Sequence, residues 1–390
     1  MRISFAVSIG ACVAALLGTG VALAGPINPP PGPVVSTPGP EPRTAINAVN
    51  TPGDSDSVFK VTQPGSYYLA GNVLGASGKH GIEIAASNVT IDLNGFALVG
   101  VVGSGSGVAM EGFRASIVVR NGTVSGWGAS GVSVPFASGF QIQGVIASGN
   151  GNIGIHGGTA GMVRDCVARA NVGIGIQVGN TVTLEGCTST ESQSHGIVVG
   201  ASCTLTNCSA ALNKLIGIQT GDASTVRGCS SIQNDGDGIF IASSSTIADS
   251  TAAANKGHGI RAVAGCLIEG NTAAGNETTG IHATHFCTIR GNVLDFNRGT
   301  GAGVGIHTTD ALNRIEGNTC TDNGTGIKVV ATRNLITGNT CGGNATAYDI
   351  AANNRYGPIV NISGGGAAAV LGSSAPDSSG TIHPFANFTY

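Results

Sequence analysis

Between residues 58 and 352, apolar and polar positions recur with a period of 21 residues. A Gly-Ile pair opens each regular copy, and its glycines are Gly154, Gly175, Gly196, Gly217, Gly238, Gly259, Gly280 and, after one insertion, Gly305 and Gly326. Less regular copies at Gly81, Gly107 and Gly131 bring the total to twelve. Side chains alternate along a strand. We therefore expect the isoleucine and the residue two places on to point inward, and the residue between them to point outward.

Two further columns accompany the Gly-Ile pairs. One holds Cys166, Cys187, Cys208, Cys229, Ser250, Asn271, Asn292, Asn318 and Asn339. The other holds Asn150, Asn171, Ser192, Asn213, Asn234, Asn255, Asn276, Asn297, Asn323 and Asn344. The side-chain amides of stacked asparagines would hydrogen-bond to one another and satisfy the polar groups of the turns.

Each copy therefore predicts one circuit of short strands, paired in parallel with the circuits above and below it. A leucine-rich repeat has a similar period, but it needs several leucines per copy, and here each copy has one isoleucine and one or two other aliphatic residues. We predict an all-β fold, a right-handed parallel β-helix solenoid of about 12 to 13 turns with a period of 21 residues.

The sequence divides into five segments. Residues 1–24 run without a charge from Ile3 to Ala24 and end in Ala22-Leu23-Ala24, which predicts a cleaved signal peptide rather than a membrane anchor. Residues 25–57 contain nine prolines and predict a linker. Residues 58–80 are expected to cap the first turn, 81–352 to form the β-helix, and the Gly/Ser-rich residues 353–390 to cover its open end.

Composition and charge agree with a solenoid. The chain has 64 glycines, 10% charged residues and 4% aromatic residues, which disfavours helical bundles and Rossmann-type folds. The net charge of −3 offers no basic field for a phosphate backbone, so nucleic acid is excluded as a partner. No second stretch is as apolar as the first, and we expect no membrane association after signal cleavage and a secreted, periplasmic or extracellular location.

Two segments carry a family resemblance. Asn88-Val89-Thr90-Ile91-Asp92-Leu93-Asn94-Gly95-Phe96, together with the iterated Gly-Ile strands, resembles the right-handed β-helix proteins of the pectin-lyase-like superfamily. Gln63-Pro64-Gly65-Ser66-Tyr67-Tyr68-Leu69 resembles the first strand of uncharacterised secreted bacterial members. The resemblance covers residues 58 to 352. It implies extracellular polysaccharide lyases, hydrolases or epimerases, but equally adhesins and non-catalytic scaffolds, because fold alone does not select a function.

Nine cysteines remain after signal cleavage, and they fall into columns. Cys166, Cys187, Cys208 and Cys229 share one column, Cys203, Cys266 and Cys287 a second, and Cys320 and Cys341 a third. The spacing between turns, about 4.8 Å, lies within the Cα range of disulfides. We favour stacked, buried free thiols, with disulfides such as Cys266–Cys287 as the alternative.

The outward residue two places after each glycine is where a solenoid would bind a ligand. Its C-terminal members are cationic and fall on four consecutive turns, at Arg261, His282, His307 and Lys328. An acidic polysaccharide would fit this strip, with the arginine or Lys328 neutralising a uronate carboxylate and a histidine or Lys328 acting as general base. Further substrate-binding candidates in the same column are His156, Gln177, Gln219 and Phe240.

A second candidate site combines Asp237 and His258, each of which directly precedes a Gly-Ile pair. Lys256-Gly257-His258-Gly259-Ile260 resembles the Gly-His-Gly motif of polygalacturonase-type hydrolases, although the second acid is missing. Glycoside hydrolysis ordinarily needs two carboxylates, and Asp235 or Asp222 would have to supply the other.

We expect no cofactor. Asn234-Asp235-Gly236-Asp237 is the one candidate calcium site, with few oxygen ligands.

Two other features bear on the site. The column ten residues after each glycine alternates in charge, for example at Arg164 and Glu185, and predicts ion pairs between turns on a solvated face. The insertion between Asn297 and Gly305 lies beside His282 and His307 and is expected to form a wall of any groove there.

We therefore predict a secreted protein that engages a polysaccharide or cell-surface glycan, in its sharpest form a lyase that cleaves a uronate-rich chain by elimination. A non-catalytic scaffold or adhesin is the alternative, and a polygalacturonase-like hydrolase the second. The sequence identifies neither the sugar nor the oligomeric state.

Overall fold

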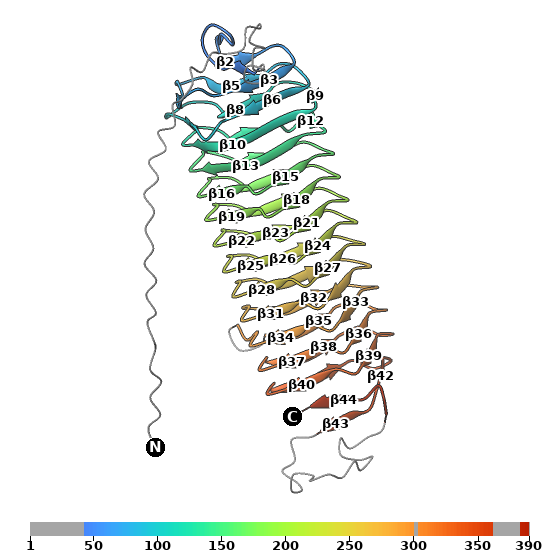
Figure 1. Cartoon of the computed structure of the whole chain (residues 1–390). Helices are drawn as coiled ribbons and strands as arrows, with labels where there is room; N and C mark the ends of the chain where they lie inside the picture. Colours follow the sequence, from blue (N-terminus) through green and yellow to red (C-terminus); the bar gives the residue numbers. More distant parts are fainter. Residues whose placement is uncertain (1–42, 300–302, 362–382, 390) are drawn as a thin grey trace, which may run out of the picture. The chain divides into compact units, whose positions relative to one another are not determined.

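The computed structural model describes residues 43–299, 303–361 and 383–389, all within a unit that spans Pro42–Tyr390. The predicted signal peptide and most of the linker lie outside the described residues. The described residues form strands and turns and no helix (Figure 1). None of them therefore forms a helix with the length and hydrophobicity that a membrane span requires.

The Gly-Ile strands form one continuous parallel sheet, which we call the front sheet. It comprises fourteen of the described strands, two more than the twelve Gly-Ile copies. They are β2 (Ser57–Val61), β5 (His80–Ile84), β8 (Val108–Met110), β11 (Val132–Ser133), β14 (Ile155–His156), β17 (Ile176–Val178), β20 (Ile197–Val199), β23 (Ile218–Gln219), β26 (Ile239–Ile241), β29 (Ile260–Ala262), β32 (Thr279–Ala283), β35 (Val304–Thr308), β38 (Thr325–Val329) and β41 (Thr346–Ile350). Each strand pairs with the next, so one turn of the coil forms one rung of a ladder.

Two further faces complete each rung, and their 28 strands are joined into one sheet by β10 (Ile117–Ser125) and β13 (Gln141–Ser148), which span both faces. The face that follows the front sheet holds β1 (Thr44–Ala45), β3 (Gly65–Tyr68), β6 (Val89–Asp92), β15 (Met162–Arg164), β18 (Thr183–Glu185), β21 (Thr204–Thr206), β24 (Thr225–Arg227), β27 (Thr246–Ala248), β30 (Leu267–Glu269), β33 (Thr288–Arg290), β36 (Arg314–Glu316), β39 (Leu335–Thr337) and β42 (Arg355–Tyr356). The third face holds β4 (Val73–Leu74), β7 (Ala97–Val99), β16 (Val167–Arg169), β19 (Thr188–Thr190), β22 (Ser209–Ala211), β25 (Ser230–Ile232), β28 (Thr251–Ala253), β31 (Thr272–Ala274), β34 (Val293–Asp295), β37 (Thr319–Thr321), β40 (Thr340–Gly342), β43 (Ile359–Asn361) and β44 (Asn387–Thr389). A separate pair, β9 (Arg114–Ala115) and β12 (Ala137–Ser138), lies at one corner.

The core is a stack of similar layers. The isoleucine of every Gly-Ile pair is fully buried, as Ile176 and Ile260 illustrate, and the second aliphatic column, which includes Leu184 and Ile268, is buried as well. Each fully buried aliphatic side chain contributes about 1.5–3 kcal/mol. Repetition of this small layer, rather than one large core, stabilises the fold. The inward positions that the period predicted are confirmed.

The Gly-Ile glycines are required for close approach rather than for a left-handed backbone. None of the nine regular ones has a positive φ. A Cβ at Gly238 would lie 2.6 Å from the Gly259 carbonyl oxygen and 2.6 Å from the Asn255 amide nitrogen. Left-handed residues occur instead at other positions of the three corners, such as Thr181 after the front sheet, Gly186 after the second face and Glu191 after the third.

The asparagine columns form the predicted ladders. The Asn213 side-chain amide donates to Asn234 Oδ1 at 2.9 Å, and Asn234 donates in the same way to Asn255 at 3.0 Å. The same oxygens also accept the backbone N–H of the residue one rung away. The ladder therefore satisfies polar groups that the turns bury.

The cysteines stack inside the coil as buried free thiols, as we favoured. All nine described cysteines are free and buried. Cys320 and Cys341 are direct partners in neighbouring strands. The hydrogen bond to the thiol one rung earlier lowers the pKa of Cys187 and Cys208, but the bond to the thiol one rung later and burial outweigh it and raise that pKa to about 12, so these thiols stay protonated.

The C-terminal residues add to the ladder. β44 pairs with β40 and with β43, so a segment far along the chain covers the last rungs (Figure 1). Tyr348 takes the inward isoleucine position of the last front strand, and its hydroxyl lies 2.8 Å from the Asn339 carbonyl and 2.9 Å from the Phe388 carbonyl.

Candidate functional site

The outward residues of the front sheet form one unbroken row, as the period predicted. From β11 to β38 each is the direct partner of the next, and we call this row the front column: Ser133, His156, Gln177, Val198, Gln219, Phe240, Arg261, His282, His307 and Lys328. Nine rung spacings of about 4.8 Å give it a length of about 43 Å. All predicted candidates on this strand face therefore share one surface.

Three imidazole rings lie together at the C-terminal end of the front column. His258, from the corner before β29, stacks on His282 with ring centroids 4.8 Å apart and planes at 27°. His307 meets His282 edge-on, with centroids 5.5 Å apart and planes at 85°. The Thr278 hydroxyl lies 2.9 Å from His258 Nδ1. Sequence reasoning had put His258 in a separate site, but the fold brings it beside His282.

Burial keeps these histidines neutral. Desolvation, with the nearby charges of His258 and Arg261, lowers the pKa of His282 to about 4. Desolvation also lowers the pKa of His258, where Asp237 opposes the shift, and that of His307, where His282 and Lys328 add to it. His282 Nδ1 and His307 Nε2 are buried without a hydrogen-bond partner. Neutral rings are competent proton acceptors at neutral pH.

Arg261 is held in place by two neighbours. Its Nε lies 2.8 Å from Asp237 Oδ2, and its guanidinium carbon lies 4.6 Å from the centre of the Phe240 ring. Asp237 is fixed in turn, because its other oxygen accepts the backbone N–H of His258 at 2.9 Å. The Asp237 side chain is 13% exposed and that of Arg261 is 40% exposed. The carboxylate thus faces the arginine, and the guanidinium keeps an open side toward solvent.

A hollow of about 370 Å³ adjoins His307 and Lys328, and it is lined by Glu277, Thr278, Thr279, Gly303, Val304, His307 and Lys328. Lys328 Nζ also lies 3.0 Å from the carboxylate of Asp349 on β41. Residues 300–302 of the insertion lie outside the described residues, but the described part of that segment lines the hollow as expected.

Sequence reasoning missed three residues here. Asp349 follows Lys328 in the front column by 21 residues, so the period itself could have found it. Glu277 follows Lys214, Asp235 and Lys256 in a charged column three residues before each Gly-Ile glycine, so the period could have found it as well. Thr278 comes from the next position, which is not regularly polar, and no sequence signal marks it. The remaining candidates, His156, Gln177 and Gln219, lie toward the other end of the front column. His156 is six rungs, about 29 Å, from His282.

The ion-pair column is confirmed in part. Arg164 pairs with Glu185 at 2.5 Å and Glu269 with Arg290 at 2.8 Å, both between rungs. Arg227 instead contacts Asp249, outside the column.

The acids of the candidate calcium segment are paired with cations. Asp235 lies 3.1 Å from Lys214 Nζ and 2.8 Å from Lys256 Nζ, which lowers the pKa of its carboxyl. Asp237 holds Arg261. A calcium ion would have to displace these contacts, and calcium binding here stays a prediction.

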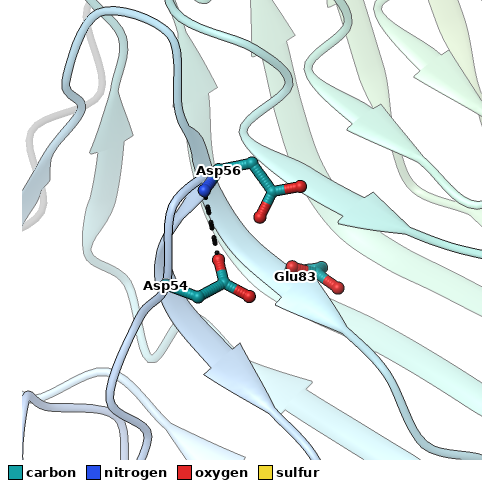
Figure 2. Close-up of side chains that lie close together, drawn as sticks. All are labelled: Asp54, Asp56 and Glu83. Atoms are coloured by element: carbon teal, nitrogen blue, oxygen red, sulfur yellow. Dashed lines mark hydrogen bonds between the residues drawn. The ribbon is translucent and has the colours of Figure 1, made fainter.

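Another acidic cluster lies at the N-terminal end, at Asp54, Asp56 and Glu83 (Figure 2). Figure 2 shows Asp54 and Asp56 on one turn and Glu83 on a neighbouring strand, with the Asp56 N–H donating to Asp54. Lys60 Nζ lies 2.7 Å from both Asp54 and Glu83. The lysine ammonium therefore takes the position that a cation would otherwise occupy.

Comparison with known proteins agrees with the fold. A family model described as the right handed beta helix region matches overlapping segments, residues 61–210, 106–267, 162–294 and 216–341. The sequence has no match among curated proteins.

Several solved structures are similar. The Dettilon tailspike protein is 15% identical, with 75% of this chain and 63% of that chain covered and a TM-score of 0.42. The A-module of an Azotobacter vinelandii mannuronan C-5 epimerase is 14% identical, with 75% and 86% covered and a TM-score of 0.41. The catalytic domain of a GH87 α-1,3-glucanase is 11% identical, with 80% and 69% covered and a TM-score of 0.46. The chain thus spans less than two thirds of the tailspike.

These likenesses concern the fold alone, whereas the family model spans most of the β-helix. The chain belongs to the family of proteins with a right-handed β-helix region.

Proposed function

We propose that the chain is a secreted protein that binds an acidic polysaccharide along the front column and cleaves it by elimination at the C-terminal end of that column. The observation that carries the proposal is the pair of neutral histidines, His282 and His307, that stands in the front column between Arg261 and Lys328. An extended polymer suits a straight row of side chains better than a small ligand does, because each sugar residue can meet a successive rung.

Arg261 supplies the contact for a uronate carboxylate. Its Nε is occupied by Asp237, and its terminal nitrogens are left to form charge-assisted hydrogen bonds. Because Asp237 and Phe240 already restrict the side chain, little conformational entropy is lost on binding. Lys328 adds a second positive charge beside the hollow.

His307 is the best placed general base. It lines the hollow and is neutral at pH 7. In an elimination, the base removes the proton from the carbon next to the carboxylate, and the electron pair forms a carbon–carbon double bond as the glycosidic oxygen leaves. Arg261 or Lys328 would stabilise the charge that develops on the carboxylate, and the Lys328 ammonium would protonate the leaving oxygen. His282, which packs between His258 and His307, is the second candidate base.

The test is the release of unsaturated sugars, measured by ultraviolet absorbance, on pectate, alginate and glycosaminoglycans. We expect turnover on at least one uronate polymer and a loss of about 10²-fold or more with His307→Ala or His282→Ala. Thr225→Ala, at an exposed position of β24 on the second face, is the control and should turn over the polymer at nearly the wild-type rate.

The alternatives predict other results. A scaffold or adhesin would bind glycan without turnover on any polymer. A polygalacturonase-like hydrolase would release reducing ends without ultraviolet absorbance and would need Asp237 as an acid. The ion pair between Asp237 and Arg261 favours the lyase over the hydrolase, because hydrolysis needs two carboxylates free to flank the bond.

A further inference from the structure

Two exposed aromatic rings lie at the N-terminal end of the front column. Phe113 follows β8 and Phe136 follows β11, so the two occupy neighbouring rungs at the same corner. They are 84% and 51% exposed. Their ring centroids are 5.5 Å apart and their planes meet at 59°. We call this pair the aromatic platform.

The backbone at this corner differs from that of the regular rungs. β9 and β12, which directly follow the two phenylalanines, pair with each other in a two-stranded sheet of their own. Residues 111–116 connect β8 to β10, whereas the shorter 179–182 connect β17 to β18. The added residues carry the two rings at the corner that follows the front sheet, where the regular rungs have a shorter turn.

The aromatic platform adjoins the open part of the front column in the chain, because Phe136 comes three residues after Ser133. Ser133 occupies the front column in the same rung as Phe136 and is the direct partner of His156. The outward positions of the two rungs on the N-terminal side of Ser133 are closed. Ala109, one rung away, is 5% exposed, and Glu83, two rungs away, is 1% exposed. The open surface thus runs from the aromatic platform to Lys328.

The chemistry of the aromatic platform suits a sugar ring. Flat aromatic faces exclude water from the apolar C–H face of a pyranose, and an open polar strip leaves the hydroxyl groups solvated. A stable protein interface needs about 800 Å² per partner, far more than two side chains supply.

We propose that the aromatic platform is a distal subsite that stacks against the same acidic polysaccharide whose carboxylates contact Arg261. This inference rests on the proposed function. The two contacts are six rungs apart, about 29 Å, so only a long chain reaches both. The stacking contact is apolar and persists at high salt, whereas the contacts of Arg261 and Lys328 weaken.

The test is titration calorimetry of the full chain with long and short pectate and alginate, at low and high salt. The variant is Phe113→Ala/Phe136→Ala, and the control is Phe385→Ala, which removes a ring that is 54% exposed near the C-terminus. We expect the double variant to bind long chains about tenfold more weakly at both salt concentrations, and short oligomers as tightly as the wild type does. The control should match the wild type, and thermal unfolding checks that each variant is folded.

Unchanged affinity for long chains would overturn the distal subsite while leaving the proposed function standing. An equal loss for long and short chains would also overturn it. So would sedimentation that shows a dimer for the wild type and a monomer for the double variant. If the wild type binds no uronate polymer at all, the proposed function fails and the subsite fails with it.

Discussion

The ion pair between Arg261 and Asp237 joins two neighbouring rungs of the coil. The sequence placed Arg261 in the front column, and the structure agrees. It also placed Asp237 in a separate hydrolase-like pair with His258. What it could not predict is that the arginine reaches back one rung to Asp237, because the period sets the face on which a side chain lies but not the rotamer that it adopts there. We interpret Asp237 as the residue that positions Arg261.

Asp237→Asn tests that interpretation. Loss of the carboxylate releases the guanidinium but keeps the acceptor for the His258 N–H. We expect KM for a uronate polymer to rise about five- to tenfold with little change in kcat, since a guanidinium that Asp237 no longer restrains loses up to about 1.5–2 kcal/mol of side-chain entropy on binding. Steady-state kinetics separates the two parameters. If turnover instead falls by about three orders of magnitude while KM stays unchanged, Asp237 is a catalytic acid and the interpretation is wrong.

Lys60 gives a second residue-scale prediction. Its ammonium lies between Asp54 and Glu83, and the Glu83 side chain is 1% exposed. Hydrogen bonds to Asp54 and Glu83 raise the pKa of Lys60. Lys60→Met leaves the Glu83 carboxylate buried without its cation, which typically costs about 3–5 kcal/mol.

Urea unfolding measures that cost, and the lower end is expected because the Lys60 side chain remains 26% exposed. Lys60→Met/Glu83→Leu should recover most of the lost stability. A Lys60→Met variant as stable as the wild type would mean that the carboxylates are neutralised in another way.

At the scale of the strand and turn, the period predicted most of the fold. The inward isoleucines, both asparagine columns and the front-column partners follow from the repeat, with 21 residues between most partners, 23 between Ser133 and His156, and 25 across the insertion between His282 and His307. The irregular elements do not follow from it. β9 and β12 exist because two early corners are longer, and Glu277 lines the hollow because a turn happens to lie beside β35. The longer corners do not recur, so no column marks them, whereas Glu277 continues the charged column of Lys214, Asp235 and Lys256 and could have been found by counting.

The asparagine ladder can be tested at one rung. Asn255 donates to Asn276 Oδ1 at 3.0 Å and to the Ser231 carbonyl at 3.1 Å, and it accepts from Asn234. Asn255→Ala leaves buried groups unpaired in two neighbouring rungs, and we expect a loss of about 3 kcal/mol in the free energy of unfolding.

Asn255→Ser should cost less, because serine already occupies this column at Ser192. The exposed Asn152 is the matched control for denaturant unfolding, and Asn152→Ala should stay within about 0.5 kcal/mol of the wild type. A similar loss in both alanine variants would show that the ladder bonds add nothing.

At the scale of the whole molecule, the neutral histidines couple stability to pH. The folded state lowers the pKa of His258, His282 and His307, whereas an unfolded histidine titrates near its ordinary pKa of 6.5. Below that pH the unfolded chain binds more protons than the folded one, so stability falls as the pH falls. For His282 the loss develops between pH 6.5 and about 4 and is constant below.

Thermal unfolding from about pH 7.5 to about pH 4 measures this dependence. His282→Gln cannot titrate, and it should flatten the part of the curve between pH 6.5 and about 4 relative to the wild type. Asn152→Ala, which removes no titratable group, is the control and should leave the shape of the curve unchanged. Equal curves for His282→Gln and the wild type would contradict a depressed pKa at His282.

The whole-molecule claim is that side chains 21 or 25 residues apart form one continuous binding surface. A crystal structure of the chain with a bound oligouronate tests it most directly. We expect the sugar chain to run along the front sheet, with one carboxylate against Arg261 and the adjacent residue over His282 and His307. An oligouronate seated on another face of the coil, or across the rungs instead of along them, would contradict it.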